Sequence, residues 1–265
     1  MLDVEFTQLS DTGHTRDHNE DYLGYVLPYT PAQLRSHGCV FALADGVGGQ
    51  QKGEVASQLA VETVLAGFSA AKSGESHKAL LSRLVQNANL KVYEQGQASR
   101  TSAGMATTIV ACALRTDRAT IAHVGDSRCY LVREGRARQI TRDHSIAAEQ
   151  VRMGILSASE AAESANRHLL SRSVGNDLVV NVEIDEVQVQ KGDVLLQCSD
   201  GLHNSVLPED IVAVIDRVGS LSIAVERLVE LANQRDGGDN ISVQLVRVHE
   251  VERTGMYRGR PYKLR

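Results

Sequence analysis

The chain has 265 residues, of which 42% are hydrophobic and 23% are charged, and its formal net charge is −5. This length and apolar content are enough to bury a full core, which excludes a disordered polypeptide. The basic residues are scattered, aromatic residues make up only 4% and Trp is absent, so a nucleic-acid-binding surface is excluded as well.

Membrane insertion and disulfide bonding are also disfavoured. No apolar run is long enough to span a bilayer, and the N-terminal segment lacks the pattern of a secretion signal. We therefore expect a cytoplasmic protein. The four cysteines stand singly, without CxxC spacing, which predicts buried reduced thiols rather than zinc ligands or disulfides.

The first part of the chain alternates strand-like and helix-like patterns. Residues 3–9 and 22–27 predict strands on either side of a polar loop, GHTRDHNED, that is rich in charge-binding groups. The apolar run FALAD then ends at Asp45 in a glycine-rich turn, GVGG. Apolar residues at helical spacing follow in 53–71 and 80–93 and predict two amphipathic helices.

From residue 104 onward the pattern changes to short strands. Residues 107–114, 119–124 and 128–133 predict successive antiparallel strands joined by tight turns. Residues 146–175 are rich in Ala and Ser and carry two short helical patterns broken at Gly154. They predict a mobile excursion from the core.

The last part of the chain returns to strands and helices before a basic tail. Strands are predicted at 182–189, 194–198 and 241–248, and helices at 208–215 and 221–232. A slip in the alternation at Asp185 and Glu186 predicts a bulge. We expect one domain over residues 1–250, followed by a solvated basic tail over 251–265.

This order of elements predicts an α+β fold. Strands occur in runs, and helices occur in pairs after the first strands and again near the end of the chain. The pattern favours a four-layer α-β-β-α sandwich of two antiparallel sheets flanked by helices over a parallel sheet with helical crossovers.

Four aspartates, each next to a glycine, stand at the ends of apolar runs: Asp45, Asp126, Asp200 and Asp239. A single Asp-Gly pair is usually only a turn, as at Asp193, but four of them at strand ends would meet at one rim of a sandwich. Ionised pairs about 5 Å apart would each cost on the order of 3 kcal/mol at an effective dielectric of about 20. Either protonation of some carboxylates or binding of hard cations would relieve this repulsion, and all-oxygen ligands indicate Mg²⁺ or Mn²⁺ rather than zinc. Metal binding is therefore the prediction.

A pair of such ions has a definite chemistry. About 3.5–4 Å apart, they would generate a hydroxide from a bridging water and clamp a phosphoryl group for in-line displacement, without a protein nucleophile. Arg16 in the first loop can bind the non-bridging phosphate oxygens through its bidentate guanidinium. Glu20 and Asp21 can hold water molecules bound to the ions.

Six motifs occur in the order RDHNED, FALADGVGG, GMATT, HVGDSRCYLVREGRARQITRDHS, LLQCSDGL and GGDNISV. Together they resemble the PPM family of metal-dependent protein serine/threonine phosphatases, also called protein phosphatase 2C. The resemblance spans nearly the whole chain. Residues 146–175, with their LLSRSVG ending, resemble the flap of the bacterial stand-alone members.

The resemblance implies a centre of two to three Mn²⁺ or Mg²⁺ ions at one rim of the sandwich. The implied ligands are Asp45 as the bridge between two ions, the Gly46 carbonyl on one of them, Asp200 and Asp239 on the other, and Asp126 with Asp200 on a third. Arg16 would bind phosphate, and Asn240 would shape a loop. The implied partners of this expected monomer are phosphorylated proteins, namely a Ser/Thr kinase and its substrates.

The sequence departs from the eukaryotic members of that family at Val47. Those members have a histidine there, which is a candidate general acid. Because valine has no proton to donate, the role would pass to a metal-bound water or to another group, with His14, His18 and His123 as alternatives.

Three rival functions are weaker. Cys112 and Arg118 have the C-x5-R spacing of cysteine-dependent phosphatases, but the residues between them lack glycine and lead into another strand. The GVGG turn lacks the Lys-Ser/Thr of a nucleotide-binding P-loop. A catalytically inactive family member that regulates by binding phosphoproteins is the remaining alternative, although every matched metal position is filled.

Overall fold

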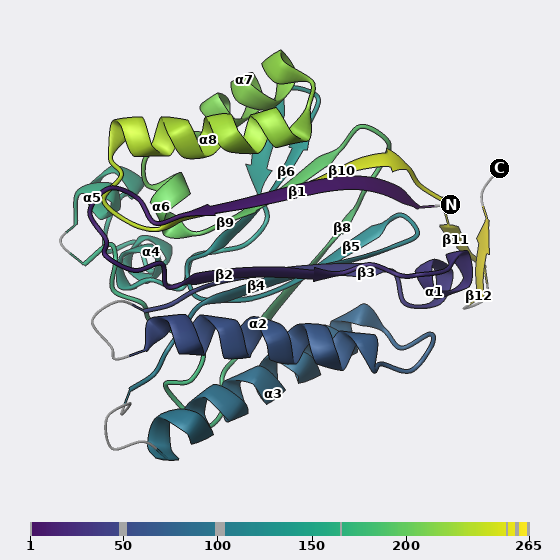
Figure 1. Cartoon of the computed structure of the whole chain (residues 1–265), viewed down its shortest axis with the longest axis horizontal. Coiled ribbons are helices and arrows are strands. Elements are labelled where there is room, and N and C mark those ends of the chain that lie inside the picture. Colours follow the sequence, from purple (N-terminus) through teal and green to yellow (C-terminus); the bar gives the residue numbers. More distant parts are fainter. Residues whose placement is uncertain are drawn as a thin grey trace.

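The computed structural model describes residues 2–47, 52–98, 104–164, 166–252, 254–257 and 260–263. Two five-stranded antiparallel sheets lie face to face at its centre, and pairs of helices cover their outer faces (Figure 1). This confirms the predicted four-layer α-β-β-α sandwich.

The first sheet has the strand order β1-β10-β9-β6-β7. Its strands are β1 (Asp3–Asp11), β10 (Ile241–Glu250), β9 (Val194–Cys198), β6 (Arg128–Arg133) and β7 (Arg136–Gln139). Helices α7 (Pro208–Val218) and α8 (Leu221–Arg235) cover its outer face (Figure 1). The apolar stripe of α8 predicted from its spacing packs against alternate residues of β9 and β10 in one buried cluster.

The second sheet has the order β2-β3-β4-β5-β8. Its strands are β2 (Asp21–Val26), β3 (Cys39–Asp45), β4 (Ile109–Arg115), β5 (Arg118–Val124) and β8 (Glu183–Gln188). Strand β3 is buried on both faces. Ala42 and Ala44 face the helices, whereas Phe41 and Leu43 face the other sheet, which explains why this strand is a continuous apolar run.

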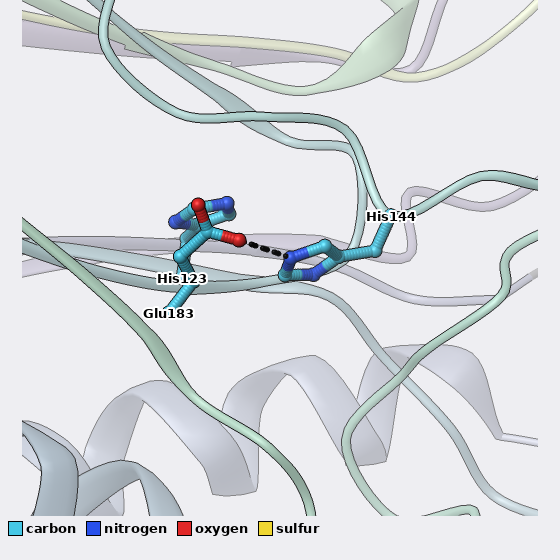
Figure 2. A group of neighbouring side chains, drawn as sticks. All are labelled: His123, His144 and Glu183. Atoms are coloured by element: carbon cyan, nitrogen blue, oxygen red, sulfur yellow. Dashed lines mark hydrogen bonds and ion pairs between the residues drawn. The ribbon is translucent and has the colours of Figure 1, made fainter. Parts of the chain in front are cut away.

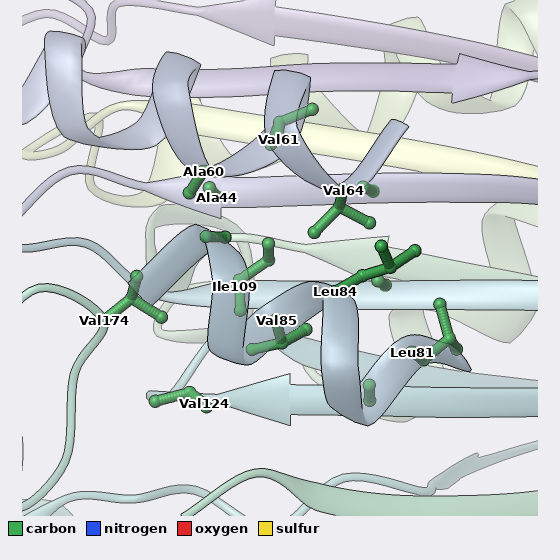
Figure 3. Packing of buried hydrophobic residues seen from close by; sticks show 14 of the residues in the cluster. Ala44, Ala60, Val61, Val64, Leu81, Leu84, Val85, Ile109, Val124 and Val174 are labelled. Atoms are coloured by element: carbon green, nitrogen blue, oxygen red, sulfur yellow. The ribbon is translucent and has the colours of Figure 1, made fainter. Parts of the chain in front are cut away.

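Helices α2 (Gly53–Ser69) and α3 (His77–Ala98) cover the outer face of the second sheet. Figure 3 shows Val64 of α2 and Leu84 of α3 packed above the sheet beside Ile109 of β4. Fully burying an aliphatic side chain of this size stabilises the fold by about 1.5–3 kcal/mol. The predicted amphipathic helices therefore close the core on this side.

Among the described residues before the tail, three short elements were not predicted: β7, α1 (Pro31–Ser36) and α6 (Asp200–His203). Helix α1 is stabilised locally by a capping box. The Thr30 hydroxyl accepts a hydrogen bond from the Gln33 backbone N–H, and the Gln33 side chain accepts one from the Thr30 backbone N–H. The predicted bulge at Asp185 and Glu186 is wrong. Strand β8 pairs with β5 in unbroken register, and its position at the edge of the sheet tolerates an imperfect alternation of apolar residues.

Residues 146–175 contain the two predicted helical segments, α4 (Ile146–Arg152) and α5 (Ala158–Glu163). The mobility of this segment stays a prediction, as does the domain boundary at residue 250. In the basic tail, β11 (Thr254–Tyr257) and β12 (Arg260–Lys263) pair with each other and with neither large sheet. The tail, predicted to be solvated chain, thus contains two paired antiparallel strands. Within the described ranges, no helix combines the length and the hydropathy needed to cross a membrane.

The packing in Figure 3 predicts a large cost for truncating α3 at its buried face. Leu84→Ala should lower the free energy of unfolding by about 2–5 kcal/mol, because Leu84 is only 2% exposed and its removal leaves a cavity. Leu90→Ala on the same helix, at 38% exposure, is the matched control and should cost far less. Urea denaturation of both variants measures the difference, and equal losses would contradict the packing described.

Candidate metal centre

Asp45 ends β3, and its backbone is held by the threonine pair of the GMATT segment. The Asp45 carbonyl accepts hydrogen bonds from the Thr108 backbone N–H (2.8 Å) and from the Thr107 hydroxyl (2.7 Å). The Asp45 N–H donates to the Thr108 hydroxyl (2.9 Å). Because all these bonds use the backbone of Asp45, they fix its position at the end of the strand without engaging its carboxylate.

Asp21 opens β2 and is the cross-strand partner of Asp45. Its side chain is buried, and neither carboxylate oxygen has a hydrogen-bond partner in the part of the chain that the structure describes. Burial raises the pKa of Asp21 to about 7, and the charge of Asp200 acts in the same direction. Two facing carboxylates destabilise a sheet unless a proton or a cation neutralises them.

The other predicted aspartates surround this pair. The pKa of Asp45 lies well above its usual value because burial disfavours its charge and because Asp21, Asp200, Asp126 and Asp239 add repulsion. Repulsion of this kind requires proximity. Contacts between the loops agree, since the Glu20 N–H donates to Asn240 Oδ1 (2.8 Å) and the His203 ring contacts the Asp126 carbonyl (3.0 Å). The loops that carry the four aspartates therefore meet at one end of the sandwich, where α6 also lies (Figure 1).

Asp126 and Asp200 are joined through the short helix α6. Asp200 is the first residue of this helix, and the His203 ring, at its other end, hydrogen-bonds through Nε2 to the Asp126 carbonyl (3.0 Å). Burial raises the pKa of Asp126 to about 7, with the charge of Asp200 as the next cause. A Cβ on Gly201 would lie 2.2 Å from the Asn240 carbonyl oxygen, so only glycine allows α6 to approach the loop of Asp239 this closely.

Asp200 itself is held in its charged form. Burial would raise its pKa, but the polar contact with the His168 side chain and then nearby positive charge outweigh burial, and the pKa lies below the usual value. His168 belongs to the 146–175 segment, and its Nδ1 lies 3.9 Å from an Asp200 carboxylate oxygen. This segment therefore reaches the carboxylate site.

Arg16 pairs with Asp239, with 2.7 Å between Nη2 and Oδ2. Both side chains are partly exposed, at 43% and 36%, so the pair lies at the surface of the site. The Asn240 side chain shapes the loop that carries Arg16, since its Nδ2 donates to the His18 carbonyl (3.0 Å) and its Oδ1 accepts from the Glu20 N–H (2.8 Å). Asn240 has the loop-shaping contacts expected of it.

Glu20 and Gly46 also meet at this rim, where the Gly46 N–H donates to the Glu20 carbonyl (3.1 Å). The pKa of Glu20 is raised by burial and by the charge of Glu54. Glu54, in the first turn of α2, was missed by the sequence prediction. The only available signal was its place in the helix that follows the Asp45 turn.

Comparison with known proteins decides the family. A family model described as protein phosphatase 2C matches residues 13–234. The chain belongs to the protein phosphatase 2C family. The serine/threonine phosphatase stp of Listeria welshimeri is 33% identical over 254 residues, which are 95% of this chain and 96% of that protein.

Solved structures agree with this membership of the protein phosphatase 2C family. The S. agalactiae serine/threonine phosphatase superposes with a TM-score of 0.84 at 33% identity, covering 93% of this chain and 100% of that one. The catalytic domain of the serine/threonine protein phosphatase PstP, in complex with two manganese ions, gives a TM-score of 0.80 at 31% identity, covering 94% and 100%.

Two alternatives lose support in this protein phosphatase 2C member. His123 is fully buried, its Nε2 lies 2.9 Å from the Arg142 carbonyl oxygen, and burial lowers its pKa, so it cannot reach a substrate as a general acid. Cys112 is a buried residue of β4 with a pKa well above its usual value, raised first by its hydrogen bond with Cys129 and then by burial. A thiol in this state is not a nucleophile.

The other sequence expectations have separate outcomes. All four cysteines are buried and free, as predicted. Val47 donates its N–H to the Ala106 carbonyl and offers no side-chain proton. Gly48 and Gly49 of the GVGG turn lie outside the described residues.

The residues at this rim fit hard divalent cations. Every predicted side-chain ligand is a carboxylate, and two buried Asp21 oxygens have no partner in the described part of the chain. Burial and then repulsion from neighbouring carboxylates raise the pKa of Asp45. Divalent ions would remove this repulsion, and oxygen donors suit Mg²⁺ and Mn²⁺.

The raised pKa of Asp21 predicts a pH dependence of stability in chelator-treated protein. Below its ordinary pKa of 3.8, Asp21 is protonated in both the folded and the unfolded state. Between that value and about 7 the folded state retains the proton that the unfolded state loses, so the free energy of unfolding should fall as pH rises. The loss due to Asp21 is at most about 4 kcal/mol.

Urea denaturation across this pH range measures the slope. Asp21→Asn should make the slope shallower, with Asp45 and Asp126 causing the remainder, whereas Asp216→Asn, at an exposed position of α7, should leave it unchanged. A slope that Asp21→Asn does not alter would show that another group causes the effect.

Proposed function

We infer that this protein hydrolyses phosphoserine and phosphothreonine in other proteins at a binuclear Mn²⁺ or Mg²⁺ centre. The observation that carries the proposal is the cross-strand pairing of Asp21 with Asp45, because the Asp21 carboxylate is buried and neither of its oxygens has a hydrogen-bond partner in the described part of the chain. Membership of the protein phosphatase 2C family and the manganese-bound PstP relative support the same conclusion.

The proposed ligands are carboxylates already gathered by the fold. Asp45 and the Gly46 carbonyl would hold one ion, Asp45 with Asp200 and Asp239 the other, and Asp126 with Asp200 a third. Glu20 and Asp21 would accept hydrogen bonds from water molecules around the ions. When bound, the cations would supply Lewis-acid charge and lower the pKa of a water molecule.

Arg16 would bind the phosphate of the substrate. Its guanidinium now pairs with Asp239 through one nitrogen at 2.7 Å and is partly exposed. A planar guanidinium can form two parallel bonds to phosphate oxygens, which both orients the group and neutralises its charge. Phosphate binding would therefore compete with Asp239 for Arg16, leaving that carboxylate available to a cation.

Four further expectations concern an inactive regulatory role, the substrates, the oligomeric state and the location. An inactive phosphoprotein-binding regulator is not favoured, because the predicted carboxylates are all present and meet at one rim. A Ser/Thr kinase and its targets as substrates, a monomeric state and a cytoplasmic location stay predictions.

Loss of a carboxylate that would hold the two ions should abolish turnover. Purified protein with Mn²⁺ should hydrolyse p-nitrophenyl phosphate and a phosphothreonine peptide. Asp45→Ala and Asp239→Ala should each lower kcat by at least about a hundredfold, a loss of about 3 kcal/mol or more of transition-state stabilisation. Asp177→Ala, at an exposed position, is the control. Inactive wild-type protein, or full activity in Asp45→Ala, would contradict the proposal.

The phosphate-binding role of Arg16 predicts a different kinetic signature. Arg16→Ala should raise KM for the phosphopeptide by about tenfold and change kcat much less, because it removes binding shared by ground state and transition state. Arg138→Ala, at an exposed position of β7, should leave both constants unchanged. Steady-state kinetics with Mn²⁺ measures both, and an unaltered KM in Arg16→Ala would reject the assignment.

A further inference from the structure

One trio of side chains in the described part of the chain has possible metal-ligand atoms within 4.8 Å of one another: His123, His144 and Glu183 (Figure 2). His123 belongs to β5, His144 precedes α4, and Glu183 opens β8. The Nδ1 atom of His123 is buried with no hydrogen-bond partner among the described residues, which at first favours a ligand at this position.

The orientation of the rings argues against a metal ion. The imidazoles of His123 and His144 are stacked, with centroids 4.7 Å apart and planes inclined by only 10°. A histidine nitrogen binds a metal in the plane of its ring, so two stacked rings cannot direct their lone pairs at one point. Two guanidinium groups add repulsion: Arg142 lies 3.6 Å from a Glu183 oxygen, and Arg172 lies 3.0 Å from His144 Nε2.

The hydrogen bonds of His144 indicate instead a structural junction, in which this residue connects two segments of the chain. Its Nδ1 accepts from the Gly125 N–H (3.1 Å), and its own backbone N–H donates to the Gly125 carbonyl (3.0 Å). Burial lowers the pKa of His144 to about 4, so the ring is neutral and has one donor and one acceptor nitrogen. With Nδ1 as the acceptor, Nε2 carries the proton and donates to Glu183 Oε2 (3.2 Å) (Figure 2). Arg172 Nη1, although close to Nε2, then has the Asn181 carbonyl (3.1 Å) as its acceptor.

The turn at Gly125, to which His144 is hydrogen-bonded, has a constrained backbone conformation. Gly125 has a φ of +106°, and a Cβ there would lie 2.6 Å from the side chain of Thr108. The next residue is Asp126, whose carboxylate belongs to the candidate metal centre. The two hydrogen bonds between His144 and Gly125 therefore fix the backbone immediately before Asp126.

The same residue also closes the base of the 146–175 segment. The His144 carbonyl accepts from the Ser171 N–H (2.9 Å), and the Ile146 N–H donates to the Leu169 carbonyl (2.8 Å). Ser145 and Leu170 form a bridge between these two bonds. The chain before α4 and the chain returning from α5 are thus paired, and His144 is the member of this pair that also contacts the Gly125 turn.

We propose that His144 is a positioning residue that couples the base of the 146–175 segment to the Gly125–Asp126 turn, so that the third ion site forms only while that base is closed. The role of Asp126 as an ion ligand rests on the proposed function, but the coupling itself does not. Removing the His144 ring should therefore loosen two segments that are distant in sequence.

Hydrogen–deuterium exchange of the full chain in chelator tests the coupling without any ion. His144→Ala should speed amide exchange in both 123–127 and 168–172, and leave α3 unchanged. His144→Asn retains an acceptor near the Nδ1 position and should restore protection at 123–127. Glu183→Gln keeps an acceptor for Nε2 and is the matched control. If His144→Ala does not fold, Glu183→Ala, which removes the partner of Nε2, should loosen both segments to a smaller degree.

Calorimetric titration with Mn²⁺ tests the consequence for the ion site. His144→Ala should weaken the lowest-affinity Mn²⁺ by about tenfold or more and leave tighter binding unchanged. Asp126→Ala identifies that same site by abolishing it.

The outcomes separate the two proposals. Faster exchange in only one of the two segments, or in neither, would overturn the coupling. Coupled exchange with no Mn²⁺ site dependent on Asp126 in the wild type would reject the third ion but support the junction. Tight Zn²⁺ binding that is lost in His123→Ala and His144→Ala would overturn the junction in favour of a metal site.

Discussion

Electrostatic repulsion among buried carboxylates is the constraint on which this structure depends. Asp45 cannot move away from its neighbours, because backbone hydrogen bonds to Thr107 and Thr108 hold it and the register of the sheet sets Asp21 opposite. Apolar side chains of similar volume in place of these carboxylates would make the fold more stable. The fold nevertheless retains it, and that is the strongest physical sign that the protein is built to bind cations. The surrounding loops, including Asn240 and α6, hold the charges in place.

Much of the fold could be predicted from patterns that depend on burial. Strand β3 is apolar throughout because both of its faces are covered, and α8 has one apolar stripe because only one of its faces is. The elements that were missed or misjudged depend on local or edge effects instead. Helix α1 depends on its capping box. Strand β8 lies at the edge of its sheet, where an imperfect alternation of apolar residues is tolerated without a bulge in the register. Apolar periodicity carries no information about either effect.

The residues of the candidate site likewise divide into those that could be predicted from the sequence and those that could not. The aspartates could be found because each ends an apolar run beside a glycine, and strand ends meet when sheets pack face to face. Glu54, His203 and His144 could not, since their contacts arise only after folding. His144, for example, meets Gly125 across 19 residues of sequence through two strands and a turn. A histidine in a polar loop carries no mark of that partner.

The distribution of the carboxylates over the two sheets has a consequence for the whole molecule. Asp21 and Asp45 adjoin the second sheet, whereas Asp200 and Asp239 adjoin the first, following β9 and preceding β10. Asp126 lies between β5 of the second sheet and β6 of the first. Cations shared between these groups would fasten one layer of the sandwich to the other, and unfolding would release them. At an ion concentration about 100 times the dissociation constant, each such ion would add about 2.7 kcal/mol to stability. Divalent-ion supply would then govern the lifetime of the protein in the cell as well as its turnover, so that a cell starved of manganese or magnesium would lose enzyme molecules and not only their activity.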